Sequence, residues 1–167
     1  MFFFMNLNYI LLFLSTIGLT IIGLNHYFHL AIFGMAPIKL DIFISIIYLA
    51  AETLVMFFFV GTGVSIKEYI QANPETDHKY HKESVAIKRV LYPPTMMATL
   101  LFVAMVIFDG GWIMGQMNRW WFHGFYFVTV YYFFKSLIIQ HQCFRKNTLL
   151  ILEMTNTKAK INLADPI

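Results

Sequence analysis

The chain has 167 residues, of which 59% are hydrophobic and 13% are charged, whereas a soluble domain carries about 25% charged residues. This composition excludes a water-soluble domain, and the single cysteine, Cys143, excludes a disulfide scaffold within the chain. The net charge of +3 is not arranged as a basic stripe interleaved with aromatic residues, which argues against nucleic acid as a partner. The composition therefore predicts an integral protein of a lipid bilayer.

Four apolar stretches are long enough to cross a hydrocarbon core of about 30 Å, which takes about 20 residues. In chain order, the predicted spans cover residues 8–33, 42–66, 93–113 and 120–142. They are too continuous for barrel strands, which alternate apolar and polar residues, and lipid leaves no other partner for free backbone groups, so helix is the remaining structure. We expect an all-α, four-helix transmembrane bundle that forms a single domain over residues 1–167.

The ends of the third span have local signals of their own. Pro93 and Pro94 suit the first turn of a helix, where a missing N–H costs nothing. Gly110 and Gly111 are typical of a helix end. The sequence therefore predicts a third helix that begins at the prolines and stops near the glycines.

Lysine and arginine are distributed unevenly between the two sides of the predicted bundle. One side has ten of them, namely Lys67, Lys79, Lys82, Lys88, Arg89, Lys135, Arg145, Lys146, Lys158 and Lys160. The other side has only Lys39 and Arg119. The positive-inside rule then places both termini, the loop 67–90 and the tail 144–167 in the cytoplasm. A bacterial inner membrane is the simplest location.

Five ionisable residues lie within the spans without an obvious route to the interface. They are His26, His29, Glu52, Asp109 and His123. Counted from the expected outer helix ends, their depths are roughly 6–16 Å, all in the outer half of the bilayer. Because each of the four spans contributes and each such residue is costly in lipid, we expect one shared site.

Helical spacing supports a shared site that faces the bundle interior. In the second span Asp41, Ser45, Tyr48 and Glu52 recur at i, i+4, i+7 and i+11, which places them on one helix face. In the first span, the two histidines are three residues apart and point the same way. Helix-bundle metal sites use the same device.

Three imidazoles and two carboxylates form a ligand set that iron, copper or zinc accepts. We therefore expect a metal-binding or redox protein in which His26, His29 and His123 coordinate a cofactor. Glu52 and Asp109 would coordinate it too or balance its charge. The first substrate class to test is a quinol or another lipid-soluble molecule, as in a respiratory chain. Whether the protein is an enzyme stays open.

Three alternatives remain. A b-type haem would need His26 or His29 opposite His123 as axial ligands. A non-catalytic accessory or assembly subunit would use the polar residues only to pack against partner helices, from another membrane protein or from a second copy of this chain. A proton or ion relay would exchange protons among the imidazoles and carboxylates.

Overall fold

The computed structural model describes residues 2–28, 34 and 36–164, with side chains for 3–28, 34 and 36–156. The described chain is all-helical, with four helices: α1 (Phe2–Phe28), α2 (Pro37–Ala72), α3 (Lys79–Ile113) and α4 (Arg119–Ala164). Each helix is long and apolar enough to cross a membrane. The prediction of four long apolar helices is thus confirmed for this part of the chain.

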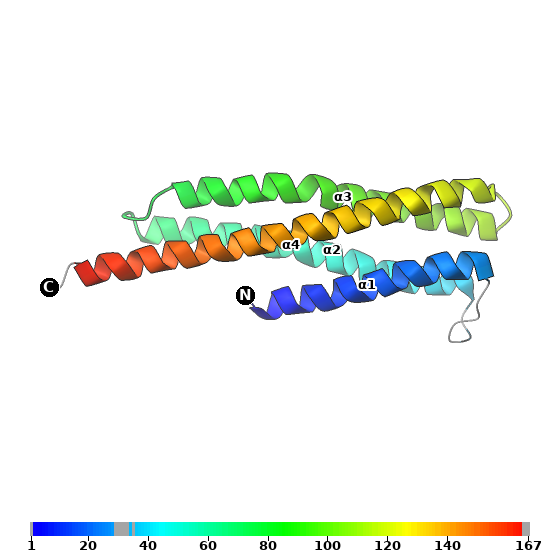
Figure 1. Ribbon diagram of the computed structural model, residues 1–167, viewed down its shortest axis with the longest axis horizontal. Helices are drawn as coiled ribbons and strands as arrows, with labels where there is room; N and C mark the ends of the chain where they lie inside the picture. Colours follow the sequence, from blue (N-terminus) through cyan, green and yellow to red (C-terminus); the bar gives the residue numbers. More distant parts are fainter. Residues whose placement is uncertain (1, 29–33, 35, 165–167) are drawn as a thin grey trace.

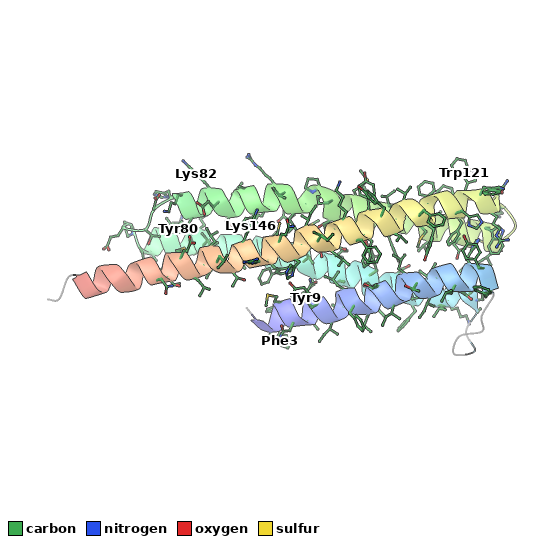
Figure 2. The ribbon with its side chains drawn as sticks, viewed as in Figure 1. Phe3, Tyr9, Tyr80, Lys82, Trp121 and Lys146 are labelled. Atoms are coloured by element: carbon green, nitrogen blue, oxygen red, sulfur yellow. The ribbon has the colours of Figure 1, made fainter. Side chains whose placement is uncertain are left out.

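The helices lie side by side in one elongated bundle (Figure 1). Each helix packs on the next in the chain, most extensively α3 on α4, whereas α1 meets α4 at only a few points. The α1–α2 and α3–α4 connections share one end, which we call the paired-loop end, and the α2–α3 connection lies at the other, the extended end. α1 stops well short of the extended end, so three helices continue past it. Figure 2 shows Trp121 at the paired-loop end and Lys82 at the extended end.

Aromatic side chains fill the interior, and large apolar side chains also cover the outside. In the core, the Tyr48 ring stacks on Phe102 with 3.9 Å between ring centroids, and Phe133 packs against both as part of one cluster. On the outside, Phe57 and Phe127 are 69% and 66% exposed. Soluble monomers rarely expose large continuous apolar surface, so the outer face suits a lipid environment.

The helices extend well beyond the predicted spans. α2, α3 and α4 have 36, 35 and 46 residues, or about 54, 52 and 69 Å at 1.5 Å per residue. Most of the predicted loop 67–90 and of the tail 144–167 is therefore helical. The extension is held by its own small core, which includes Ile70, Tyr80 and Leu150, and apolar run length alone gave no sign of it.

The prediction that Pro93 and Pro94 begin the third helix is wrong. α3 begins at Lys79, so both prolines lie inside it. The helix starts in polar sequence before the apolar run and continues through both prolines, although a proline inside a helix removes a backbone donor and costs about 3 kcal/mol or more. At its other end, α3 stops two residues after Gly111, where Gly115, with φ of +70°, donates its N–H to the Trp112 carbonyl at 2.8 Å.

Candidate functional site

The four helices bring polar side chains together close to the paired-loop end. We call this group the His26 cluster: His26, Asp41, Asp109 and, at its edge, Tyr27 and His123. Asp41 is four residues from the start of α2, Asp109 four from the end of α3, and His123 four from the start of α4. At 1.5 Å per residue, each is about 6 Å from its helix end, so all lie at a similar height.

His26 and Asp109 form the buried centre of the cluster. The Nδ1 atom of His26 lies 2.6 Å from Oδ1 of Asp109, and each residue is only 3% exposed. The imidazole ring is stacked on Phe122 at a centroid distance of 3.7 Å, and Trp112 lies 4.3 Å away. The other ring nitrogen, Nε2, is buried and has no hydrogen-bond partner among the described residues. The aspartate thus fixes the ring and leaves Nε2 available for a proton or a ligand.

Asp41 adds a second carboxylate to this centre. Its side chain is 2% exposed and interacts with that of Asp109. Neither carboxylate oxygen of Asp41 receives a hydrogen bond from any part of the chain that the structure describes. Two ionised carboxylates in one buried site are costly, so such a pair shares protons or takes up a cation.

The edge of the cluster is aromatic and positively charged. The Tyr27 hydroxyl and Nδ1 of His123 are 2.9 Å apart, and their rings are stacked. The His123 ring meets that of His26 edge to face at 5.3 Å. The Arg119 guanidinium lies 5.5 Å from the Tyr27 ring centroid and 5.8 Å from that of Trp112. This edge separates the buried carboxylates from the surroundings of the bundle.

Glu52 belongs to a different group, deeper in the bundle. In this Glu52 cluster, Nε2 of Gln140 donates to Oε2 of Glu52 at 2.7 Å and to Oγ of Ser136 at 3.0 Å. Thr95 lies 3.4 Å from Ser136, and all four residues are buried. One carboxylate oxygen of Glu52, Oε1, has no partner within the described residues. The cluster links α2, α3 and α4.

A polar stripe on one face of α2 runs from the first cluster to the second. It consists of Asp41, Ser45, Tyr48 and Glu52, the face predicted from the sequence. Tyr48 is fully buried, interacts electrostatically with Glu52, and has a hydroxyl without a hydrogen-bond partner in the described chain. Eleven residues separate Asp41 from Glu52, or about 16 Å along the helix. Three buried residues of this stripe therefore each have at least one oxygen without a partner.

The structure brings together three of the five predicted site residues. His26, Asp109 and His123 meet as expected, whereas Glu52 is fifteen residues into α2, or about 22 Å from its start. Its depth was underestimated because the second span was expected to begin at residue 42. The α2 carboxylate at the level of His26 is Asp41, which had been placed on the right face but outside the span. His29 lies outside the described residues.

The described residues do not assemble the predicted metal or haem site. Among the described residues, no group of three or more His, Cys, Asp or Glu side chains is arranged to hold a metal ion. The rings of His26 and His123 are in edge-to-face contact, so no porphyrin fits between them in this arrangement. No family model, curated protein or solved structure matches the chain.

Proposed function

We propose that this is an integral membrane protein that takes up protons at the His26 cluster and relays them along the α2 stripe to Glu52, which releases them toward the extended end. The observation that carries the proposal is the stripe itself, in which Asp41, Tyr48 and Glu52 are buried on one face with oxygens that lack partners. In hydrocarbon, each unsatisfied polar group costs several kcal/mol. Ionisable groups inside spans are kept where they pair or take part in ion or proton movement.

The groups of the stripe have the chemistry that a relay needs. An imidazole can accept a proton at Nε2 while its Nδ1 stays bonded to Asp109, and the paired carboxylates can hold another. Tyr48 is seven residues from Asp41 and four from Glu52, or about 10 and 6 Å along the helix. Both gaps exceed a hydrogen bond of about 3 Å, and the unpartnered oxygens of the stripe are sealed from water in this arrangement. Water molecules that enter when the helices move apart would complete the path.

Proton flux into liposomes is the direct test. Purified protein is reconstituted with an internal pH dye, a potassium diffusion potential is imposed, and the initial rate of acidification is recorded. We expect Glu52→Gln to abolish the flux and Tyr48→Phe to lower it at least about tenfold, one unit in log rate. Matched controls are Glu68→Gln on the exposed face of α2 and Tyr131→Phe, which is 61% exposed.

Two results would refute the relay. One is a wild-type flux no greater than that of protein-free vesicles. The other is a flux that Glu52→Gln leaves unchanged. If neither flux nor bound cofactor is found and a membrane protein co-purifies stably, the accessory role is supported instead.

Membrane insertion and orientation are part of the proposal and have their own test. The apolar outer surface supports insertion, and nine of the ten positive residues, all but Lys135, lie toward the extended end, which supports a cytoplasmic location for that end. In a Cys143→Ser background, single cysteines are introduced as Glu75→Cys and Gln116→Cys, in the two connections at opposite ends. An impermeant maleimide on intact cells should label only the second. Labelling of only the first would reverse the orientation, and equal labelling would contradict insertion.

A metal centre is the second candidate, and the His26–Asp109 contact favours it. Histidines that bind metals usually donate their other ring N–H to a carboxylate, and Nε2 of His26 is free in that sense. His123 is near, and His29 is the third imidazole predicted from the sequence. The visible spectrum and the bound iron, copper and zinc are measured on the purified protein. Stoichiometric metal that is lost in His26→Gln and kept in the control His78→Gln would support a redox or metal-binding role over the relay. A metal-free protein with full proton flux would refute the metal centre.

A further inference from the structure

An apolar layer closes the bundle between the Glu52 cluster and the extended end. We call it the Leu91 layer, and its side chains, which form one core cluster and are at most 3% exposed, are Val55, Phe59, Leu91, Cys143 and Phe144. On α2, α3 and α4, one member of this layer lies three or four residues from a member of the Glu52 cluster. The layer thus begins about one turn from the cluster on every helix that contributes to it.

Polar side chains return further toward the extended end. Ser84 on α3 and Asn147 on α4 are each 1% exposed, and Nδ2 of Asn147 has no hydrogen-bond partner among the described residues. A Cβ atom at Gly63 on α2 would overlap the Lys88 ammonium and lie 3.5 Å from Oγ of Ser84, so the lysine packs over the glycine beside the serine. Lys88 and Asn147 are each three residues beyond the Leu91 layer. That layer therefore separates two polar layers of the interior.

A proton that leaves Glu52 toward the extended end must cross the Leu91 layer. Gln140 and Asn147, on its two sides, are seven residues apart on α4, or about 10 Å along the helix, whereas a hydrogen bond spans about 3 Å. Among the side chains of the layer only the Cys143 thiol is polar, and its Sγ atom donates weakly to the Ile87 carbonyl at 3.9 Å. A buried water molecule needs about 2–4 polar partners, which the layer does not supply. Apolar constrictions of this kind gate pores by excluding water.

We propose that the Leu91 layer is a hydrophobic gate, which seals Glu52 from the extended end and opens only when it takes up water. The side formed by α2 and α4 is held together, because the rings of Phe59 and Phe144 are 5.1 Å apart between centroids. α3 is the helix that moves, since Pro93 and Pro94 lie between Leu91 and the Glu52 cluster. The gate rests on the proposed relay, in which it controls the release step, whereas the seal itself does not.

The first test measures the seal without proton flux. In a Cys143→Ala background, which keeps the layer apolar, Ser136→Cys places a thiol in the Glu52 cluster, at a position that is 1% exposed. Its reaction with methanethiosulfonate ethylammonium, a small water-soluble thiol reagent, is followed by mass spectrometry in lipid nanodiscs. We expect Leu91→Asn to speed this reaction at least about tenfold, because a polar side chain admits water to the layer. The matched control is Leu150→Asn, the same change at a 4% exposed position in the core of the extension, and it should leave the rate unchanged.

The second test measures proton flux for the same pair of substitutions in the liposome assay. We expect Leu91→Asn to raise the initial rate at least about tenfold, Leu150→Asn to leave it unchanged, and Leu91→Asn combined with Glu52→Gln to have no flux. Circular dichroism checks the helicity of each variant, and Leu91→Ala takes the place of Leu91→Asn if that variant does not fold.

Equal labelling rates in Leu91→Asn and Leu150→Asn would overturn the seal and the gate with it. A raised flux that survives Glu52→Gln would overturn the gate, because the protons would then bypass Glu52. A wild-type protein without flux refutes the relay, and the labelling rates still decide whether the seal exists. The failure of this inference and the failure of the relay are therefore distinguishable.

Discussion

Replacing Gly23 with alanine tests how closely α1 and α4 pack beside the His26 cluster. A Cβ atom at this position would overlap the hydroxyl oxygen of Tyr126 and lie 2.5 Å from its Cζ atom. The same hydroxyl donates to the Leu19 carbonyl at 3.3 Å. Alanine at this position must therefore displace the tyrosine side chain or push the two helices apart.

The expected cost follows from three contributions. Overpacking a closely fitted interface costs about 1–3 kcal/mol, and loss of the hydrogen bond to Leu19 adds about 1 kcal/mol. Alanine is better than glycine in a helix by about 0.5–1 kcal/mol, which offsets part of the loss. We expect Gly23→Ala to lower the free energy of unfolding by about 1–3 kcal/mol.

The assay is equilibrium unfolding in mixed micelles, in which the detergent that denatures is increased stepwise and helicity is followed by circular dichroism. Gly61→Ala and Gly124→Ala are matched controls, because a Cβ atom at either position meets no atom within 4 Å. Both should be neutral or slightly stabilising. Tyr126→Leu combined with Gly23→Ala should recover part of the loss. If Gly23→Ala and the two controls unfold at the same detergent concentration, the close approach of α1 and α4 is refuted.

Three further substitutions or reactions test the interior. Phe133→Ala should lower the free energy of unfolding by about 3–5 kcal/mol, the usual cost of emptying a buried aromatic site, whereas Phe134→Ala, 49% exposed, should change it little in the same assay. Gln140→Leu should cost about 1–3 kcal/mol because the buried carboxylate of Glu52 loses its donor, and near-neutral behaviour would show that this contact is not made. Cys143 is 3% exposed, so its reaction with maleimide, followed by mass spectrometry, should be much slower in the folded protein than after denaturation; equal rates would contradict its burial.

The sequence predicts the number of helices but not where each helix begins and ends. Long apolar runs decide that four helices form, because every backbone group in such a run needs an internal partner. They do not decide where each helix ends, since a helix continues through polar sequence when it still packs. The segment from Lys79 to Arg89 shows this, because its polar residues form the first part of α3.

The residues of the site could be predicted better than the depth of each one in the bundle. Asp109 and His123 lie near helix ends that the apolar runs locate within one residue, and His26 lies two residues before the last described residue of α1, so their meeting was predictable. Glu52 was assigned to the wrong level because an error of five residues in a helix start moves a side chain by about 7 Å. Only the tertiary arrangement separates it from the others.

Gln140 is not among the predicted site residues, because it is neutral and the predicted site rests on the ionisable residues within the spans. A signal for it was nevertheless present. Thr129, Ser136, Gln140 and Asn147 recur on α4 at i, i+7, i+11 and i+18, and all four are buried. This spacing places the four residues on one helix face, as the spacing of i, i+4, i+7 and i+11 does for the polar stripe on α2. A search for uncharged polar residues at this spacing would have found the second half of the Glu52 cluster.

The two prolines inside α3 have a mechanical consequence. Because neither has an N–H, the carbonyls of Arg89 and Val90, four residues earlier, lack the hydrogen bond that an α-helix normally provides. Bending α3 at this level breaks fewer hydrogen bonds than bending it elsewhere, and α2 and α4 pass the same level without a proline. The point lies where the charged extension joins the apolar part of the bundle. A force applied to the extension would therefore bend α3 near Leu91 more easily than it would bend α2 or α4 at the same level.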